Sequence, residues 1–388
     1  MPSLPSDSSR RPASSGGMRV PYNDLHAQYL TIKADVDAAI ARTIRDSAFI
    51  RGPEVEAFER NFAQAIGTKH CVSCANGTDA LYIAFRALGL QPGDEVITSA
   101  HSWIATSETI TQAGGRVVFA DTEAATCTID PASVEKKITA RTRGIVPVHL
   151  YGQPADMDAI MALARKHNLW VVEDCAQAHL ARYRGRAVGT FGVLATYSFY
   201  PGKNLGAMGD AGCLVTNDDQ LADFAAMFAR HGGKTKGDHQ IEGINSRLDG
   251  LQAAVLNVKL AHLARWTQTR RELAAAYHQR LTGVGDLVLP VAADGRDHVY
   301  HIYAVRTARR DALKAHLAAH GIQTQLNYPT ALPFLPAYAR LGHVPADFPQ
   351  AHAHQSQLLS LPLYPEITGA QIDFLVEQIK AFFAASRG

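Results

Sequence analysis

The sequence has no long apolar run and no marked excess of charge of either sign. Its continuous apolar stretches, such as Leu169-Trp170-Val171-Val172, span only a few residues, whereas a helix that crosses a bilayer needs about 20. Lys and Arg number 38 against 36 Asp and Glu, a formal charge of +2. These absences exclude a transmembrane helix and disfavour binding to nucleic acid or to anionic membranes through overall charge.

Cysteine is scarce and odd in number, which argues against a secreted disulfide framework. Of the five cysteines, Cys71 and Cys74 form the one C-x-x-C spacing, so a four-cysteine zinc site is excluded and a short strand is the simpler interpretation. Residues 1–17 are rich in Ser and Pro and lack the apolar run of a secretory signal. We therefore predict a cytoplasmic protein with a disordered tail over residues 1–17, and Met18, which follows two glycines, is a candidate start.

What the sequence does contain is a globular composition with alternating strand and helix patterns. Of its 388 residues, 47% are hydrophobic and 19% are charged, which allows a large core and fits two lobes. Short apolar runs alternate with helical segments up to about residue 260, as in a mainly parallel sheet covered by helices on both faces. We expect a large α/β domain over residues 18–260 and a smaller α+β domain over residues 261–388.

Periodicity and capping signals place individual elements within these domains. Apolar residues three and four apart predict helices, and Thr368 and Gln371 have the spacing of a capping box. The predicted helices are 29–44, 54–66, 80–88, 102–113, 157–167, 251–281 as one long or bent helix, 310–320 and a last one from Thr368. The predicted strands are 96–97, 117–119, 145–148, 170–172, 214–215, 298–307 and 322–326.

Three polar motifs occupy positions where ligands bind in such a fold. Asp174 ends an apolar strand, and the carboxyl ends of parallel strands open onto ligand pockets. Lys203 follows an aromatic strand in a glycine-bounded loop that does not match a Walker A motif, and a buried lysine with a lowered pKa can form a Schiff base. Asn76-Gly77-Thr78-Asp79 is a polar turn before a helix, whose N-terminus offers free N–H groups to a phosphate.

Each of these motifs alone has an ordinary explanation, namely a solvated carboxylate, a surface lysine and a helix cap. Together they supply an amine for an imine, a carboxylate partner for a pyridinium nitrogen and an anion site. Pyridoxal 5′-phosphate requires all three. The combination therefore predicts an enzyme that uses this cofactor.

Further motifs resemble those of the DegT family of fold-type I, pyridoxal-phosphate-dependent sugar aminotransferases, over about residues 20–383. The resembling segments are Gly52-Pro53-Glu54-Val55, Asn76-Gly77-Thr78-Asp79-Ala80-Leu81, Glu173-Asp174-Cys175-Ala176-Gln177-Ala178-His179, Ser198-Phe199-Tyr200-Pro201-Gly202-Lys203-Asn204, Gly243-Ile244-Asn245-Ser246-Arg247-Leu248-Asp249 and Leu359-Ser360-Leu361-Pro362. The resemblance implies a large lobe with a mainly parallel sheet flanked by helices, and a smaller C-terminal α+β lobe.

The resemblance also implies roles for individual residues. Lys203 would form the imine with the cofactor and later move a proton, and Asp174 would keep the pyridine nitrogen protonated. The remaining implied cofactor contacts are Gly77, Thr78, Asp79 and Ser198 at the phosphate, Gln177 at the ring hydroxyl, Trp103 on the ring face, and Asn245 at the phosphate of a second subunit. Candidate substrate contacts are Arg247, Asn327 and Tyr328. The implied active site is complete only in a homodimer, and no metal is expected.

The reaction implied by the resemblance is a ping-pong transfer. An amino acid, usually L-glutamate in this family, gives its amino group to the cofactor, and a keto sugar linked to a nucleoside diphosphate receives it. Asp210 stands where members that aminate C4 tend to carry Glu, which favours C3. Asn327-Tyr328-Pro329 replaces His-Tyr-Pro, and Leu332-Pro333 replaces Leu-His, so the contacts of those imidazoles do not transfer to this chain.

Two alternatives remain open at this level. One is a sugar dehydratase of the same fold; related dehydratases carry His in place of the imine lysine, so Lys203 argues against it. The other is a non-catalytic regulatory relative. Loss of catalytic residues is expected there, whereas Lys203 and Asp174 are both present.

Overall fold

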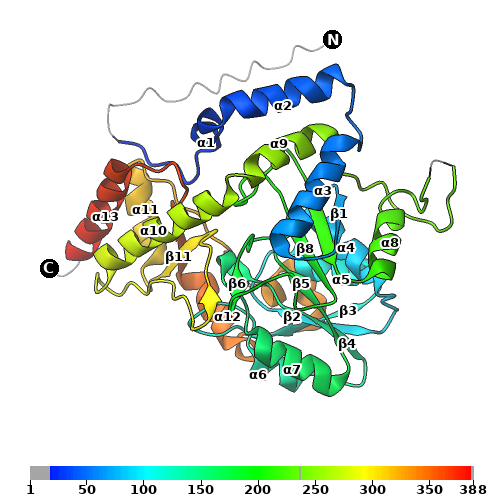
Figure 1. Ribbon diagram of the computed structural model, residues 1–388. Coiled ribbons are helices and arrows are strands. Elements are labelled where there is room, and N and C mark those ends of the chain that lie inside the picture. The colour runs from blue at the N-terminus through cyan, green and yellow to red at the C-terminus, as the bar shows by residue number, and fades with distance from the viewer. Residues whose placement is uncertain (1–17, 236, 386–388) are drawn as a thin grey trace, which may run out of the picture.

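A seven-stranded sheet forms the centre of the computed structural model, which describes residues 18–235 and 237–385 (Figure 1). The tail predicted over residues 1–17 lies outside this part of the chain. The strand order is β1-β9-β8-β5-β4-β2-β3, and β9 is antiparallel to both neighbours while the other pairs are parallel. The strands are β1 (His70–Cys74), β2 (Glu95–Ser99), β3 (Arg116–Ala120), β4 (Thr142–Val146), β5 (Trp170–Asp174), β8 (Leu194–Ser198) and β9 (Gly212–Thr216). The predicted mainly parallel sheet is confirmed.

Helices cover both faces of this sheet, because buried parallel strands present apolar side chains on either side. Helices α4 (Gly77–Ala87), α5 (Ala105–Gln112) and α8 (Asp219–Phe228) pack on one face. The opposite face carries α3 (Pro53–Ile66), α6 (Pro131–Lys137), α7 (Met157–His167) and α9 (Gly250–Leu260). All five cysteines are buried and unpaired, and Cys71 and Cys74 lie in β1 as the strand interpretation predicts.

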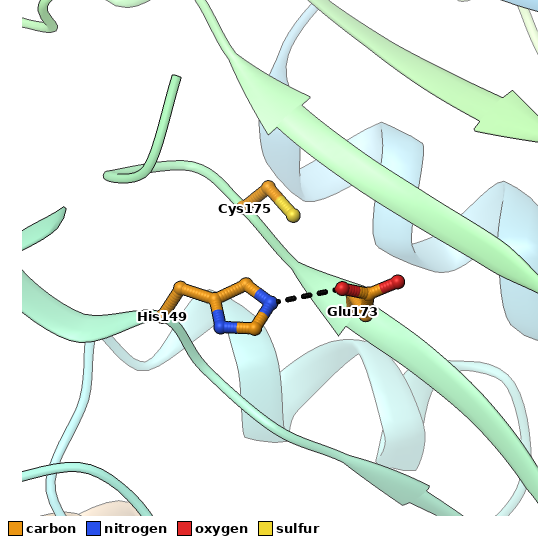
Figure 2. Close-up of side chains that lie close together, drawn as sticks. All are labelled: His149, Glu173 and Cys175. Atoms are coloured by element: carbon orange, nitrogen blue, oxygen red, sulfur yellow. Dashed lines mark hydrogen bonds and ion pairs between the residues drawn. The ribbon is translucent and has the colours of Figure 1, made fainter. Parts of the chain in front are cut away.

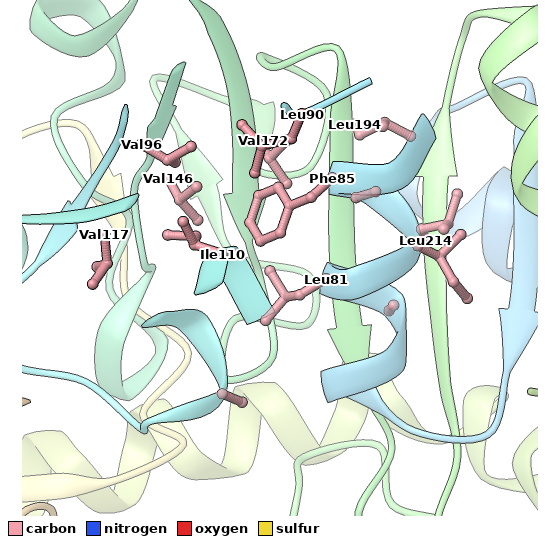
Figure 3. Close-up of a cluster of buried hydrophobic side chains, with 14 of the residues drawn as sticks. Leu81, Phe85, Leu90, Val96, Ile110, Val117, Val146, Val172, Leu194 and Leu214 are labelled. Atoms are coloured by element: carbon pink, nitrogen blue, oxygen red, sulfur yellow. The ribbon is translucent and has the colours of Figure 1, made fainter. Parts of the chain in front are cut away.

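The position of α4 follows from its apolar stripe. Leu81 and Phe85, four residues apart, are buried against Val146, Val172 and other strand residues (Figure 3). Asn76 caps the helix, because its side chain accepts a hydrogen bond from the Asp79 N–H at 2.8 Å. The packing and the cap together hold the N-terminus of α4 beside Ser198, at the carboxyl end of β8.

The C-terminal part of the chain builds a separate core around a two-stranded sheet. Strands β11 (Tyr303–Arg306) and β12 (Leu358–Leu361) pair antiparallel. Residues of α10 (Leu263–Leu281), α11 (Arg310–Ala319) and α13 (Gly369–Ala384) bury apolar side chains against them. The capping box at Thr368 and Gln371 is present at the start of α13. The domain boundary at residues 260 and 261 stays a prediction.

The remaining elements connect or flank these two cores. Helices α1 (Leu25–Thr31) and α2 (Lys33–Arg45) precede α3, and α2 packs beside α9 (Figure 1). Short elements complete the chain, namely β6 (Arg182–Tyr183), β7 (Arg186–Ala187), β10 (Arg296–Asp297), α12 (Pro349–Gln357), and the 3₁₀ turns η1 (Leu150–Gly152), η2 (Leu332–Phe334), η3 (Pro336–Leu341) and η4 (Pro345–Asp347). None of the described helices is both long and apolar enough to span a membrane. A cytoplasmic location stays a prediction.

Several predicted elements are broken in the structure. The helix over residues 29–44 is interrupted at Ile32, whose backbone is not helical, and the helix over residues 251–281 is interrupted between α9 and α10. The predicted strand 298–307 shortens to β11, because the N–H groups of Val299 and Ile302 donate to carbonyls of η1 instead of to a strand. The predicted strand 322–326 forms only isolated bridges at Ile322 and Gln325.

Candidate active site

A cavity of about 730 Å³ opens at the carboxyl ends of β5 and β8. This is the edge where open α/β sheets bind ligands. Of the residues predicted for the site, it is lined by Gly77, Thr78, Trp103, Asp174, Gln177, Ser198, Lys203, Asn327 and Tyr328. Asp79, Asn245 and Arg247 do not line it.

Asp174 is the last residue of β5, and its carboxylate is held inside the cavity wall. Its Oδ2 accepts from the Thr106 hydroxyl at 2.8 Å, and its Oδ1 accepts from the Ala176 N–H at 3.1 Å. The backbone is fixed between two neighbours, because its N–H donates to Pro147 and its carbonyl accepts from His149. A buried carboxylate of this kind needs a cationic partner.

Lys203 lies in the loop after β8 and faces the same cavity. Desolvation lowers the pKa of its amine to about 8, although the nearby Asp174 carboxylate acts in the opposite direction. A larger fraction of this amine is therefore neutral near pH 7 than of an exposed lysine. A neutral amine is the form that attacks a carbonyl carbon.

The N-terminus of α4 forms an anion cradle beside Ser198. The N–H groups of Gly77 and Thr78 have no hydrogen-bond partner within the described part of the chain, as expected for the first turn of a helix. A Cβ at Gly77 would lie 2.7 Å from the Ser198 Cβ, so only glycine allows this close approach. Two free amides, two hydroxyls and the helix dipole suit a phosphate.

Gln177 is oriented by two hydrogen bonds. Its Oε1 accepts from the Tyr151 N–H at 2.6 Å, which identifies that atom as the oxygen, and its Nε2 donates to the Tyr328 hydroxyl at 2.9 Å. The second Nε2 hydrogen stays available to a ligand. Trp103 is 58% exposed, and its ring lies 5.5 Å from that of Tyr328. Two aromatic rings therefore stand next to each other on the cavity wall.

Asn327 stands where the sequence resemblance leads us to expect a histidine, and hydrogen bonds hold it in the cavity wall. Its Oδ1 accepts from the Ser360 hydroxyl at 2.9 Å and from the Tyr22 hydroxyl at 3.4 Å. Its carbonyl accepts from the Tyr151 hydroxyl. The amide thus bridges the N-terminal segment and β12.

Three predicted residues stand apart from the cavity of their own chain. Asp79 donates its N–H to Asn76, and its Oδ2 accepts from the Ser246 hydroxyl at 2.6 Å, so it supports the helix cap. Asn245 is exposed and bridges to Arg230 through the backbone, and Arg247 is half-buried. Asp79 therefore has no free N–H to offer a phosphate, and contacts of Asn245 or Arg247 with a second subunit stay predictions.

The structure adds cavity residues that sequence reasoning missed. They are chiefly Tyr22, Asn23, Thr106, Arg270, His301 and Gln325. Arg270 had a detectable signal, since this charged residue sits on the buried stripe of α10 with Ala274, Tyr277 and Leu281. Its Nη1 donates to the carbonyls of Tyr300 and Leu363, and among the described residues no carboxylate lies within ion-pair distance. The other residues come from segments without a recognisable motif.

These groups fit pyridoxal 5′-phosphate. The cavity offers an amine whose pKa is lowered, a carboxylate for a ring nitrogen, an amide at Gln177 and a cradle that admits no Cβ. The sequence profile of the DegT/DnrJ/EryC1/StrS aminotransferase family matches residues 30–380. The chain belongs to this family.

Individual members of the family are similar over nearly the whole chain. A pleiotropic regulatory protein of Geobacillus stearothermophilus is 46% identical over 94% of this chain and 99% of its own. The dTDP-3-amino-3,4,6-trideoxy-alpha-D-glucose transaminase of Streptomyces venezuelae is 46% identical over 93% of this chain and 96% of its own. The crystal structure of S. venezuelae DesV in complex with a ketimine intermediate superposes with a TM-score of 0.92, at 45% identity over 94% of this chain and 98% of that one.

The family assignment confirms three predictions. The fold class is that of these aminotransferases, the protein is an aminotransferase, and its cofactor is pyridoxal 5′-phosphate. The individual roles of the site residues stay predictions. Their placement around one cavity supports those roles for all but Asp79, Asn245 and Arg247.

Proposed function

We propose that this protein transfers an amino group from L-glutamate to C3 of a keto sugar linked to a nucleoside diphosphate. One observation supports the transfer of an amino group: Lys203 and Asp174 line the same cavity as the anion cradle at the start of α4. The substrate part is supported by the S. venezuelae relative, whose name is that of a dTDP-3-amino sugar transaminase. Asp210, the residue that favours C3, also lines the cavity.

We assign each cavity residue to the part of the cofactor that its position would let it contact. Gly77, Thr78 and Ser198 would hold the cofactor phosphate, Asp174 the ring nitrogen and Gln177 the ring hydroxyl. When bound, pyridoxal phosphate supplies an electron sink for the carbon that exchanges its amino group. The lowered pKa of Lys203 lets its amine accept and return a proton near neutral pH.

Arg270 is our candidate for the carboxylate of the amino donor. It is the one guanidinium that lines the cavity in the described ranges, and two carbonyls hold its Nη1 in place. An arginine fixed in this way recognises a carboxylate with little loss of side-chain entropy. The donor's amine must meanwhile reach the part of the cavity that holds Lys203.

A second subunit is part of the proposal. Asn245 and Arg247 lie outside the cavity of their own chain, and Asn245 is exposed. Both are therefore free to contribute to the active site of a partner in a symmetric dimer.

The test of this function is product formation from a defined keto sugar. The protein is loaded with pyridoxal phosphate and given L-glutamate together with a dTDP-linked or UDP-linked 3-keto sugar. Mass spectrometry and NMR should find the 3-amino sugar and 2-oxoglutarate in equal amounts. A 4-amino product would overturn the C3 proposal. Release of a deoxy keto sugar without nitrogen would support the dehydratase alternative.

A further inference from the structure

Behind the active-site cavity lies a second polar cluster that the reaction does not use. His149, Glu173 and Cys175 are fully buried, and their ligand atoms lie within 4.8 Å of one another (Figure 2). Glu173 precedes Asp174 in β5, so the two side chains point to opposite faces of the sheet. A group of His, Glu and Cys has the composition of a metal site.

The hydrogen bonds of Glu173 leave no room for a metal. Its Oε1 accepts from the N–H groups of Phe191 and Gly192, at 2.7 and 2.8 Å. Its Oε2 accepts from the Gly189 N–H at 2.8 Å and lies 3.1 Å from the His149 Nε2. A carboxylate has about four lone-pair sites, and all of them are used here.

His149 and Cys175 are equally unsuited to bind a metal. The His149 Nδ1 accepts from the Ala155 N–H at 3.0 Å, so the ring proton is on Nε2, which donates to Glu173. Neither ring nitrogen keeps a lone pair for a cation. Burial raises the pKa of the Cys175 thiol well above its usual value, which disfavours the thiolate that a metal requires.

The same hydrogen bonds tie two loops to the strand that carries Asp174. Gly189 and Gly192 belong to the segment that leads into β8, and a Cβ on Gly192 would lie 2.3 Å from the Val171 carbonyl oxygen. The glycines therefore allow the backbone to reach Glu173. On the other side, His149 holds Ala155, at the far end of the turn that contains Tyr151.

That turn leads back to the cofactor face. The Tyr151 N–H donates to the Oε1 of Gln177, and this bond sets the orientation of the Gln177 amide. Asp174 is adjacent to Glu173 in the chain, and its carbonyl accepts from the His149 N–H at 3.0 Å. The hydrogen-bonded pair of His149 and Glu173 therefore supports both predicted ring contacts, Asp174 and Gln177, from the opposite face of the sheet.

We propose that Glu173 and His149 form a structural clasp, not a metal site, that positions Asp174 and Gln177 for the cofactor ring. They are positioning residues, since neither lines the cavity. The proposal rests on the predicted cofactor roles of Asp174 and Gln177. It predicts that a change on the far face of the sheet alters the properties of the bound cofactor.

The test compares Glu173→Gln with the matched variant Glu95→Gln. Like Glu173, Glu95 is buried in a strand of this sheet and does not line the cavity. It accepts from the Thr139 hydroxyl and the Arg141 guanidinium, which belong neither to β5 nor to the turn that contains Tyr151. In each variant an NH₂ group replaces an acceptor and meets hydrogen-bond donors. Both should lower the melting temperature. Only Glu173→Gln should shift the pH midpoint of the cofactor absorbance band, in the direction given by Asp174→Asn.

A second pair of variants keeps the proposal testable if Glu173→Gln does not fold. His149→Gln places an amide near the Nε2 position and retains a donor to Glu173, whereas His149→Asn retains an acceptor for Ala155. Each breaks one half of the clasp and should reduce kcat more than it changes the donor KM. The clasp is overturned if Asp174→Asn shifts the band while Glu173→Gln and both His149 variants leave it unchanged. It is also overturned by one bound metal per chain that Glu173→Gln removes. If Asp174→Asn itself changes nothing, the cofactor role of Asp174 fails instead.

Discussion

At the scale of single residues, the chemistry of the site depends on how far burial shifts the pKa of its charged groups. Lys203 is desolvated in the cavity wall, and this lowers the pKa of its amine to about 8. Arg270 is desolvated on the neighbouring helix, which lowers the pKa of its guanidinium to about 10. The two cations thus respond differently at neutral pH, since part of Lys203 is neutral while Arg270 keeps its charge.

The lowered pKa of Lys203 predicts how fast the apoprotein takes up pyridoxal phosphate at different pH values. Below pH 8 the amine is mostly protonated and cannot attack, and above pH 8 it is mostly neutral. The uptake rate should therefore rise up to about pH 8 and then level off, which stopped-flow absorbance measures. A rate that keeps rising through pH 10 would mean that Lys203 titrates like an exposed lysine.

Arg270 predicts a preference for donors that carry an α-carboxylate. The wild-type protein should react far better with L-glutamate than with γ-aminobutyrate, which is glutamate without that group. Arg270→Lys keeps a charge but loses the fork of donors, so the preference should fall by about tenfold, or about 1.4 kcal/mol. The half-reaction with each donor is followed by absorbance. An unchanged ratio of the two rates would assign the carboxylate to another residue.

At the scale of elements, α4 links packing to cofactor binding. Its apolar stripe presses Leu81 and Phe85 onto the sheet, and the Asn76 cap completes its first turn. Much of this was predictable, because the polar turn at residues 76–79 and the helical pattern that follows it are local signals. The breaks at Ile32 and between α9 and α10 were not, since the surrounding residues keep helical periodicity and the interruptions have no local signal.

The Asn76 cap yields a prediction with an internal control. Asn76→Ala should cost about 1 kcal/mol of the free energy of unfolding, as cap removal usually does. Asp218→Ala, which removes the cap of α8, should cost a similar amount. Only Asn76→Ala should also weaken the binding of pyridoxal phosphate, as measured by fluorescence titration. Equal affinities in the two variants would show that the start of α4 does not hold the phosphate.

At the scale of the whole molecule, some features follow from local sequence patterns, and others depend on contacts between segments that are far apart in the sequence. The parallel sheet and the placement of Lys203 and Asp174 on one cavity were predictable, because continuous apolar strands and their polar ends form local patterns. The short β11 and the positions of Tyr22 and Arg270 on the cavity wall depend on segments that meet only in the folded chain. Asn245 and Arg247 lie outside the cavity of their own chain, and their contact with a second subunit stays a prediction.

The proposed dimer predicts complementation between inactive variants. Lys203→Ala and Asn245→Ala should each be inactive or nearly so. When the two are unfolded together and refolded, mixed dimers should contain one intact site, and about a quarter of the wild-type activity should return by random pairing. Activity that stays at the level of the separate variants would place Lys203 and Asn245 in the same subunit's site, or remove Asn245 from it.

The most direct test of the central claim is the near-ultraviolet and visible absorbance of the purified protein with pyridoxal phosphate, recorded before and after L-glutamate is added. We predict a band from the cofactor attached at Lys203, which glutamate converts to that of the pyridoxamine form. Lys203→Ala should lack the band. A wild-type protein without the band, or with a band that no amino donor changes, would contradict the assignment of this cavity as an aminotransferase site.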